Sequence, residues 1–151
     1  MISAGEPAPE LTLHREDGSE FGRADLEGQT TVLVFYPFAF SPVCTDQLNL
    51  YEEVLGDFKA RGATLYGVSC DASWSQKAFR EQLGVSIEQL SDFEPKGETC
   101  RAFGVYHPGG FPQRALVIVG PDAVVNWSYE ASSPGDLPGA NLIFDGLAAA
   151  G

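Results

Sequence analysis

The hydrophobic positions of this chain divide it into alternating strands and helices. An unbroken apolar run, Val32–Tyr36, predicts a strand at 31–36 that is buried on both faces. From position 41 to Arg61-Gly62, apolar residues recur every three or four positions, which predicts a helix with one buried face and a left-handed glycine cap. The residues on that face are Leu48, Tyr51, Leu55 and Phe58.

The rest of the chain repeats this strand and helix order around a single expected core. A helix at about 73–83 is expected to bury Trp74 and Ala78, together with Phe79 and Leu83. The other predicted elements are a hairpin at 8–21, strands at 64–69, 85–90, 115–119 and 124–129, and helices at 97–103 and 139–149. Residues 107–112 are expected to form a loop because they contain two prolines and two glycines. We therefore predict one α/β domain over residues 1–151, with a mixed sheet and helices on both faces.

The segment 37–44, between the first buried strand and the first long helix, carries the strongest chemical signal. Ser41 is a good helix N-cap, and Pro42 then occupies the first helical position, where a missing N–H has no cost. Cys44 consequently falls in the first helical turn. Unpaired amide groups and the positive end of the helix dipole favour a thiolate there, so Cys44 is predicted to be a reactive cysteine.

Composition and charge exclude several classes of function. A net charge of −12 argues against nucleic acid or an anionic membrane as partner, because both require clustered Lys and Arg. The charge is compatible with a small neutral substrate. The start of the chain lacks the basic and apolar regions of a secretory signal, and we expect a cytoplasmic protein. Three widely spaced cysteines and two distant histidines have no metal-ligand spacing, and no glycine-rich nucleotide loop follows a strand, so no metal or cofactor is expected.

The spacing Pro37-x-x-x-Ser41-x-x-Cys44 resembles the signature of the peroxiredoxins, the alkyl hydroperoxide reductase/thiol-specific antioxidant family. The resemblance extends over nearly the whole chain and is greatest to the alkyl hydroperoxide reductase E-like branch. The other parts of the chain that resemble the family are residues 7–13, 38–40, 90–97 and 103–106, and Arg114 just before a late strand.

This resemblance implies a thioredoxin-like fold and a thiol-dependent peroxidase that reduces hydrogen peroxide and organic hydroperoxides. Cys44 would become a sulfenic acid, with Arg114 beside the sulfur. Ser41 and the amide groups of Val43 and Cys44 would hold the peroxide, and Pro37 would shield the sulfur from water. The resemblance also implies a homodimer or a larger homo-oligomer.

The second thiol that restores the enzyme is not evident from the sequence. Asn49 and Arg80 occupy positions where family members carry resolving cysteines. Cys70 and Cys100 remain as possible resolving residues, although each is also compatible with a purely structural role. We therefore expect a one-cysteine mechanism, with a low-molecular-weight thiol or a thioredoxin- or glutaredoxin-like protein as reductant.

Several alternative interpretations remain open. A peroxide-sensing switch protein would need the same reactive Cys44. A thioredoxin-type dithiol exchanger is disfavoured, because Ser41 occupies the first position of Cys-x-x-Cys. Arg114 could be a surface residue and Ser41 only a cap, and Gln47 stands where many family members have Glu. His14 and His107 are expected to be exposed, while Phe38, Phe40 and Phe93 could line a pocket entrance, form a dimer contact or pack in the core.

Overall fold

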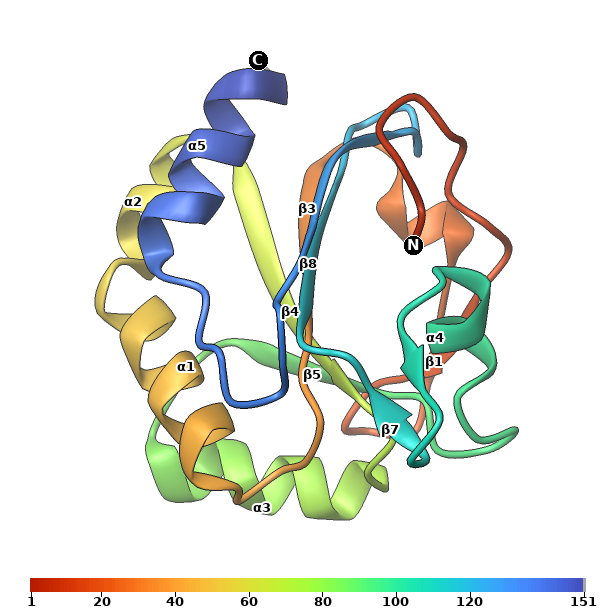
Figure 1. The fold of residues 1–151 in the computed structure, drawn as a ribbon, viewed down its shortest axis with the longest axis vertical. Helices are drawn as coiled ribbons and strands as arrows, with labels where there is room; N and C mark the ends of the chain where they lie inside the picture. Colours follow the sequence, from red (N-terminus) through yellow and green to blue (C-terminus); the bar gives the residue numbers. More distant parts are fainter. Residues whose placement is uncertain (151) are drawn as a thin grey trace.

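A mixed seven-stranded sheet organises the computed structural model, which describes residues 1–150 (Figure 1). The strand order is β2-β1-β5-β4-β3-β8-β9, and a separate two-stranded sheet pairs β6 with β7. The strands are β1 Thr12–His14, β2 Glu20–Gly22, β3 Thr30–Phe35, β4 Ala63–Ser69, β5 Glu88–Ser91, β6 Tyr106–His107, β7 Phe111–Pro112, β8 Ala115–Val119 and β9 Val125–Glu130.

The apolar run identified in the sequence forms the centre of this sheet. Strand β3 pairs in parallel with β4, Val32 opposite Leu65, and antiparallel with β8, Val32 opposite Ile118. Strand β5 lies parallel to β4, and β9 lies antiparallel to β8. The mixed sheet and the N-terminal hairpin, β1 and β2, are therefore confirmed.

Helices and the N-terminal segments cover the two faces of the sheet and create two hydrophobic clusters. The side chains of β3 alternate between them: Val32 and Val34 face one cluster, Leu33 and Phe35 the other. The first cluster is covered by four helices: α1 Pro42–Glu53, α2 Leu55–Ala60, α3 Ser73–Leu83 and α5 Ala140–Ala150. The second is covered by the 3₁₀ helix Arg23–Leu26, α4 Glu98–Ala102 and the segment before β1. Figure 1 shows α1, α2 and α5 on one side of the sheet and α4 on the other.

The first long helix differs from the prediction, although its buried face does not. Two helices, α1 and α2, replace the continuous helix expected from position 41 to Gly62, because the backbone at Val54 departs from helical geometry. Leu48, Tyr51, Leu55 and Phe58 are all buried, as predicted. Gly62 has φ 78°, which is the left-handed geometry expected after the helix.

Helix α3 has the predicted bounds but buries a different face. Trp74 is 82% exposed and Ala78 is exposed, so both predicted core positions are wrong. Phe79 is buried as expected, and Gln76 is the second buried residue of the helix. Gln76 Nε2 donates to Ser69 Oγ and to the Leu90 carbonyl, at 2.9 and 2.8 Å. Because its amide is bonded to the sheet, a polar residue occupies a core position that hydrophobic periodicity cannot detect.

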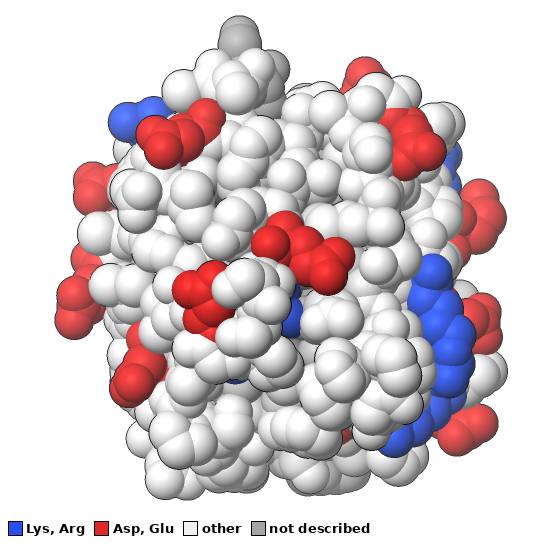
Figure 2. Space-filling model, in the orientation of Figure 1, with Lys and Arg blue, Asp and Glu red and all other residues white. Residues whose placement is uncertain are grey.

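The exterior of the molecule carries a small hairpin and many acidic side chains. Residues 107–112, expected to be a loop, contribute to the β6–β7 hairpin outside the central sheet. Acidic side chains are spread over the visible face in Figure 2, in keeping with the net charge of −12. Within the described residues, no helix has the length and apolar character required to cross a membrane.

Candidate active site around Cys44

Cys44 lies in the first turn of α1 and is fully buried. Pro42 occupies the first helical position and Ser41 the N-cap position, as the sequence predicted. The Thr45 amide donates to the Ser41 carbonyl at 2.9 Å. The Ser41 side chain, however, caps no amide: its Oγ donates to the Phe38 carbonyl at 3.0 Å. The expected hydroxyl cap is therefore wrong, and the amides of Val43 and Cys44 have no helical acceptor one turn earlier.

Arg114 reaches the sulfur from the residue just before β8. Its side chain is buried, at 2% exposure, which excludes the surface alternative. Nη2 donates to Cys44 Sγ at 3.2 Å, Nε donates to the Pro134 carbonyl at 2.8 Å, and Nη1 donates to Gln47 Oε1. The guanidinium is thus fixed by three acceptors, two of them on α1 and the third on the segment that contains Pro134. The guanidinium therefore places a positive charge beside the sulfur.

Gln47 extends this contact into a buried hydrogen-bond chain that the sequence reading did not identify. Its Nε2 donates to the Tyr51 hydroxyl at 3.1 Å, and that hydroxyl donates to the Pro138 carbonyl at 2.7 Å. Burial raises the pKa of Tyr51 to about 12, so the phenol stays protonated and remains a donor. The spacing of Cys44, Gln47 and Tyr51 along one helix face was the available signal.

A small, largely apolar pocket of about 240 Å³ opens beside this network. Pro37 lines it and is buried, and the half-exposed Phe38 ring lies 5.1 Å from that of Phe111 between ring centroids. Phe38 therefore lines a pocket entrance, one of the alternatives considered for it. The lining residues are Pro37, Phe38, Ser41, Pro42, Val43, Phe111, Arg114, Pro134 and Gly135.

The loop 37–41 is tied to the end of β4. The Ala39 amide donates to Asp71 Oδ2 at 2.8 Å, and the same oxygen accepts from Ser69 Oγ at 2.8 Å. Phe40 adopts φ 70°, a left-handed conformation that is unfavourable for a bulky residue, and its ring lies 5.2 Å from that of Phe79. The anchored loop thus sets the position of Ser41. Sequence reasoning did not identify Asp71 in this role.

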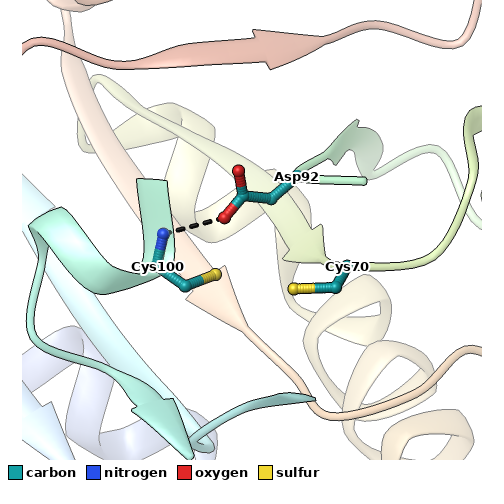
Figure 3. A group of neighbouring side chains, drawn as sticks. All are labelled: Cys70, Asp92 and Cys100. Carbon is teal, nitrogen blue, oxygen red and sulfur yellow. Dashed lines mark hydrogen bonds between the residues drawn. The ribbon is translucent and has the colours of Figure 1, made fainter. Parts of the chain in front are cut away.

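Cys70 and Cys100 lie together, away from Cys44. Both belong to the hydrophobic cluster on the opposite face of the sheet from the cluster that contains Cys44. Their sulfurs and a carboxylate oxygen of Asp92 lie within 4.8 Å of one another (Figure 3). The sequence interpretation, which treated the cysteines as scattered, did not anticipate this cluster.

The remaining candidate residues are peripheral to the Cys44 network. His14 lies in β1 and His107 in β6, and both are partly buried rather than exposed as expected. The His107 ring stacks on Phe111, with 4.3 Å between centroids. Phe40 and Phe93 are 49% and 54% exposed, so core packing does not account for them.

Comparison with known proteins identifies the family to which the chain belongs. The AhpC/TSA family matches residues 4–128. Alkyl hydroperoxide reductase E of Mycobacterium tuberculosis is 28% identical over 151 residues, which covers 99% of this chain and 98% of the relative. A second M. tuberculosis relative, which carries the name peroxiredoxin, is 35% identical over 105 residues, covering 70% of this chain and 66% of the relative. The chain therefore matches just under two thirds of that second relative.

Solved structures establish the fold. The crystal structure of Enterococcus faecalis AhpC superposes with a TM-score of 0.87 at 24% identity, covering 99% of this chain and 92% of that one. The structure of M. tuberculosis AhpC superposes with a TM-score of 0.85 at 21% identity, covering 99% and 93%. These similarities confirm the predicted α/β thioredoxin-like fold with its mixed sheet and N-terminal hairpin.

Proposed function

The chain belongs to the AhpC/TSA family, the thiol-dependent peroxidases known as peroxiredoxins, and from that premise we propose that it reduces hydrogen peroxide and organic hydroperoxides through Cys44. The observation that carries this proposal is the contact between Arg114 Nη2 and Cys44 Sγ at 3.2 Å, at the start of a helix and beside a pocket. A thiolate is the reactive form of cysteine, and the guanidinium places a positive charge beside this sulfur at the start of the helix.

The proposed reaction begins with attack of the Cys44 thiolate on one peroxide oxygen. The sulfur–oxygen bond forms as the oxygen–oxygen bond breaks, and the leaving oxygen takes a proton and departs as water or alcohol. Negative charge moves from sulfur onto oxygen during this step. Arg114, held by Gln47 and the Pro134 carbonyl, is placed to stabilise that charge without reorganising.

Ser41 and the first turn of α1 are proposed to orient the peroxide. Because Ser41 Oγ donates its proton to the Phe38 carbonyl, its lone pairs are directed to accept from the O–H of a hydroperoxide. The Val43 and Cys44 amides, without helical acceptors, supply donors for the peroxide oxygens. Pro37 and Phe38 provide apolar walls that limit water around the sulfur and accept the organic part of the substrate.

A one-cysteine mechanism is proposed for the return to the thiol. The position of Cys70 and Cys100 in the cluster across the sheet supports this, because neither thiol is beside Cys44. An external thiol would attack the sulfenic sulfur, release water and form a mixed disulfide, and a second thiol would then free Cys44. A low-molecular-weight thiol, or a thioredoxin- or glutaredoxin-like protein, has the required chemistry.

The decisive experiment is intact mass measurement after one equivalent of hydrogen peroxide, with and without dimedone. We expect a gain of one oxygen that dimedone traps. The gain should be absent in Cys44→Ser and retained when both Cys70 and Cys100 are replaced by alanine. An oxygen gain of the same size in Cys44→Ser would overturn the assignment of the peroxidatic residue.

Turnover separates the peroxidase from the peroxide-sensing alternative. A peroxidase consumes many equivalents of peroxide when dithiothreitol is present, whereas a sensor without a turnover function reacts once and stops. We expect continuous consumption. A single stoichiometric burst in the presence of excess thiol would favour the sensor.

Self-association is also part of the proposal. Phe40, Trp74 and Phe93 leave large aromatic surfaces exposed, at 49%, 82% and 54%, and Trp74 and Phe93 line the same surface hollow. Exposed aromatic surface of this kind is typical of protein contacts. We expect sedimentation equilibrium to give a dimer or larger assembly, and Trp74→Glu together with Phe93→Glu to give monomer.

A further inference from the structure

A buried dithiol lies on the face of the sheet opposite the proposed active site. We propose that Cys70 and Cys100 form a reversible intramolecular disulfide, a second redox site that works independently of Cys44. The two side chains approach from different elements and direct their sulfurs toward each other (Figure 3).

The backbone around this thiol pair, Cys70 and Cys100, is held by Asp92. Cys70 directly follows β4, and Asp92 directly follows β5, the parallel neighbour of β4. The Asp92 carboxylate accepts the amide of Thr99 at 3.1 Å and the amide of Cys100 at 2.8 Å. These bonds fix the first turn of α4 beside the end of β4. The sequence places the two cysteines thirty positions apart, and the carboxylate brings them into one cluster.

The geometry requires little movement for bond formation. The sulfurs lie no more than 4.8 Å apart, and a disulfide bond measures about 2.0 Å. Rotation of the two Cys side chains, with a small shift of the five-residue helix α4, can close this gap. Both residues lie in one hydrophobic cluster, so the bond would form inside the existing core.

The two thiols differ in accessibility and acidity. Cys70 is 8% exposed and Cys100 is fully buried, so an oxidant reaches Cys70 first. The neighbouring Cys100 thiol lowers the pKa of Cys70, whereas the neighbouring Cys70 thiol, burial and the nearby Asp92 raise the pKa of Cys100. Cys70 is therefore the attacking thiolate and Cys100 the thiol that completes the bond.

The proposed disulfide forms in two steps, with a hydroperoxide as the oxidant. Cys70 attacks the peroxide, forms a sulfenic acid, and releases water or alcohol. Cys100 then attacks the Cys70 sulfur, the sulfenic hydroxyl leaves with the Cys100 proton as water, and the disulfide forms. Two electrons pass from the thiol pair to the peroxide. An external dithiol reverses the change.

A metal site is the competing use of the same three side chains. Structural zinc sites have four protein ligands, and only Cys70, Cys100 and Asp92 are grouped here within the described residues. Each Asp92 oxygen already accepts a backbone amide. These contacts favour the dithiol.

The test uses Cys44→Ser, so that failure of the proposed peroxidase function cannot affect the result. The protein is prepared reduced, treated with excess hydrogen peroxide, and analysed by intact mass, thiol titration and peptide mapping. We expect loss of two hydrogens, loss of both remaining thiols, and a cross-link between the peptides that contain Cys70 and Cys100. Dithiothreitol should restore both thiols.

Two matched variants assign the steps. Cys44→Ser with Cys100→Ala should give a Cys70 sulfenic acid that dimedone traps, whereas Cys44→Ser with Cys70→Ala should leave Cys100 unreacted. The mapping of Cys44→Ser does not depend on these core variants, so it remains decisive if either fails to fold. The proposal would be overturned if both thiols persisted in folded Cys44→Ser, or if the only cross-link formed between chains. It would also be overturned if one zinc ion bound per chain and blocked oxidation.

Discussion

The Arg114 guanidinium and the Cys44 sulfur lie 3.2 Å apart although seventy positions separate them in the chain. The antiparallel pairing of β8 with β3 produces this proximity, because Ala115 lies opposite Phe35 at the end of the strand that leads to the 37–41 loop. The register of two central strands thus places a cation beside the helix start that carries the thiol.

Replacing Arg114 tests how much its contact with Cys44 contributes to the rate of peroxide reduction. Arg114→Met removes the charge and the donors at similar length, and we expect kcat/KM for hydrogen peroxide to fall about 10²- to 10³-fold. Arg114→Lys keeps the charge but cannot donate to Cys44, Gln47 and the Pro134 carbonyl at once, so a smaller loss is expected. Stopped-flow measurement of peroxide consumption gives these rates, and circular dichroism checks the fold. An unchanged rate in folded Arg114→Met would remove Arg114 from the mechanism.

Gln47 is expected to position Arg114 rather than to contact peroxide. Gln47→Met leaves a buried guanidinium donor without its acceptor, which should lower the free energy of unfolding by about 1–3 kcal/mol. The peroxide rate should also fall, but less than in Arg114→Met. Gln47→Glu restores an acceptor at the same place and should recover most of the rate. Equal rates in Gln47→Met and the unchanged protein would show that Arg114 needs no such support.

The raised pKa of Tyr51 should make the free energy of unfolding fall in alkaline solution. Its pKa is raised from 10.0 to about 12 by burial, so the native state holds the phenol proton more tightly than the unfolded chain does. This contribution is complete below pH 10 and is lost as pH rises from 10 to about 12. Tyr51→Phe should therefore show a flatter fall in unfolding free energy over this range. It should also lose about 1 kcal/mol at neutral pH, because the hydroxyl bonds to Gln47 and Pro138 disappear. Urea titrations at several pH values measure both effects.

The sequence predicted much of the fold because local patterns decided its main elements. The apolar run became β3, Pro42 and Ser41 marked the start of α1, and glycines ended α2 and α3 with left-handed geometry. Patterns of this kind do not report partners distant in sequence. The Asp71 carboxylate accepts the Ala39 amide, and the Asp92 carboxylate accepts the Thr99 and Cys100 amides. Both acids follow parallel strands, so the pairing of those strands decides which distant residues they meet. The hydroxyl direction of Ser41 likewise depends on the shape of the loop before it, which allows Phe38 to accept.

The sequence wrongly placed Trp74 of α3 in the core, and stability measurements on two α3 variants test this correction. Phe79→Ala should cost about 3–5 kcal/mol because the ring is buried. Trp74→Ala, five positions earlier on the exposed face, should change the free energy of unfolding by no more than about 0.5 kcal/mol. Chemical denaturation at low protein concentration, where self-association contributes little, compares the two. A large cost for Trp74→Ala under these conditions would mean that its ring is covered in the monomer.

The acidic surface has a kinetic consequence for the choice of peroxide. With a net charge of −12 and acidic residues spread over the visible face (Figure 2), the protein repels anions at distances up to the Debye length, about 8 Å at physiological ionic strength. The second-order rate constant for a hydroperoxide bearing a carboxylate should therefore rise as salt is added, while that for hydrogen peroxide should stay constant. Discrimination between charged and neutral oxidants would then be set in the solvent around the molecule, before either reaches the sulfur.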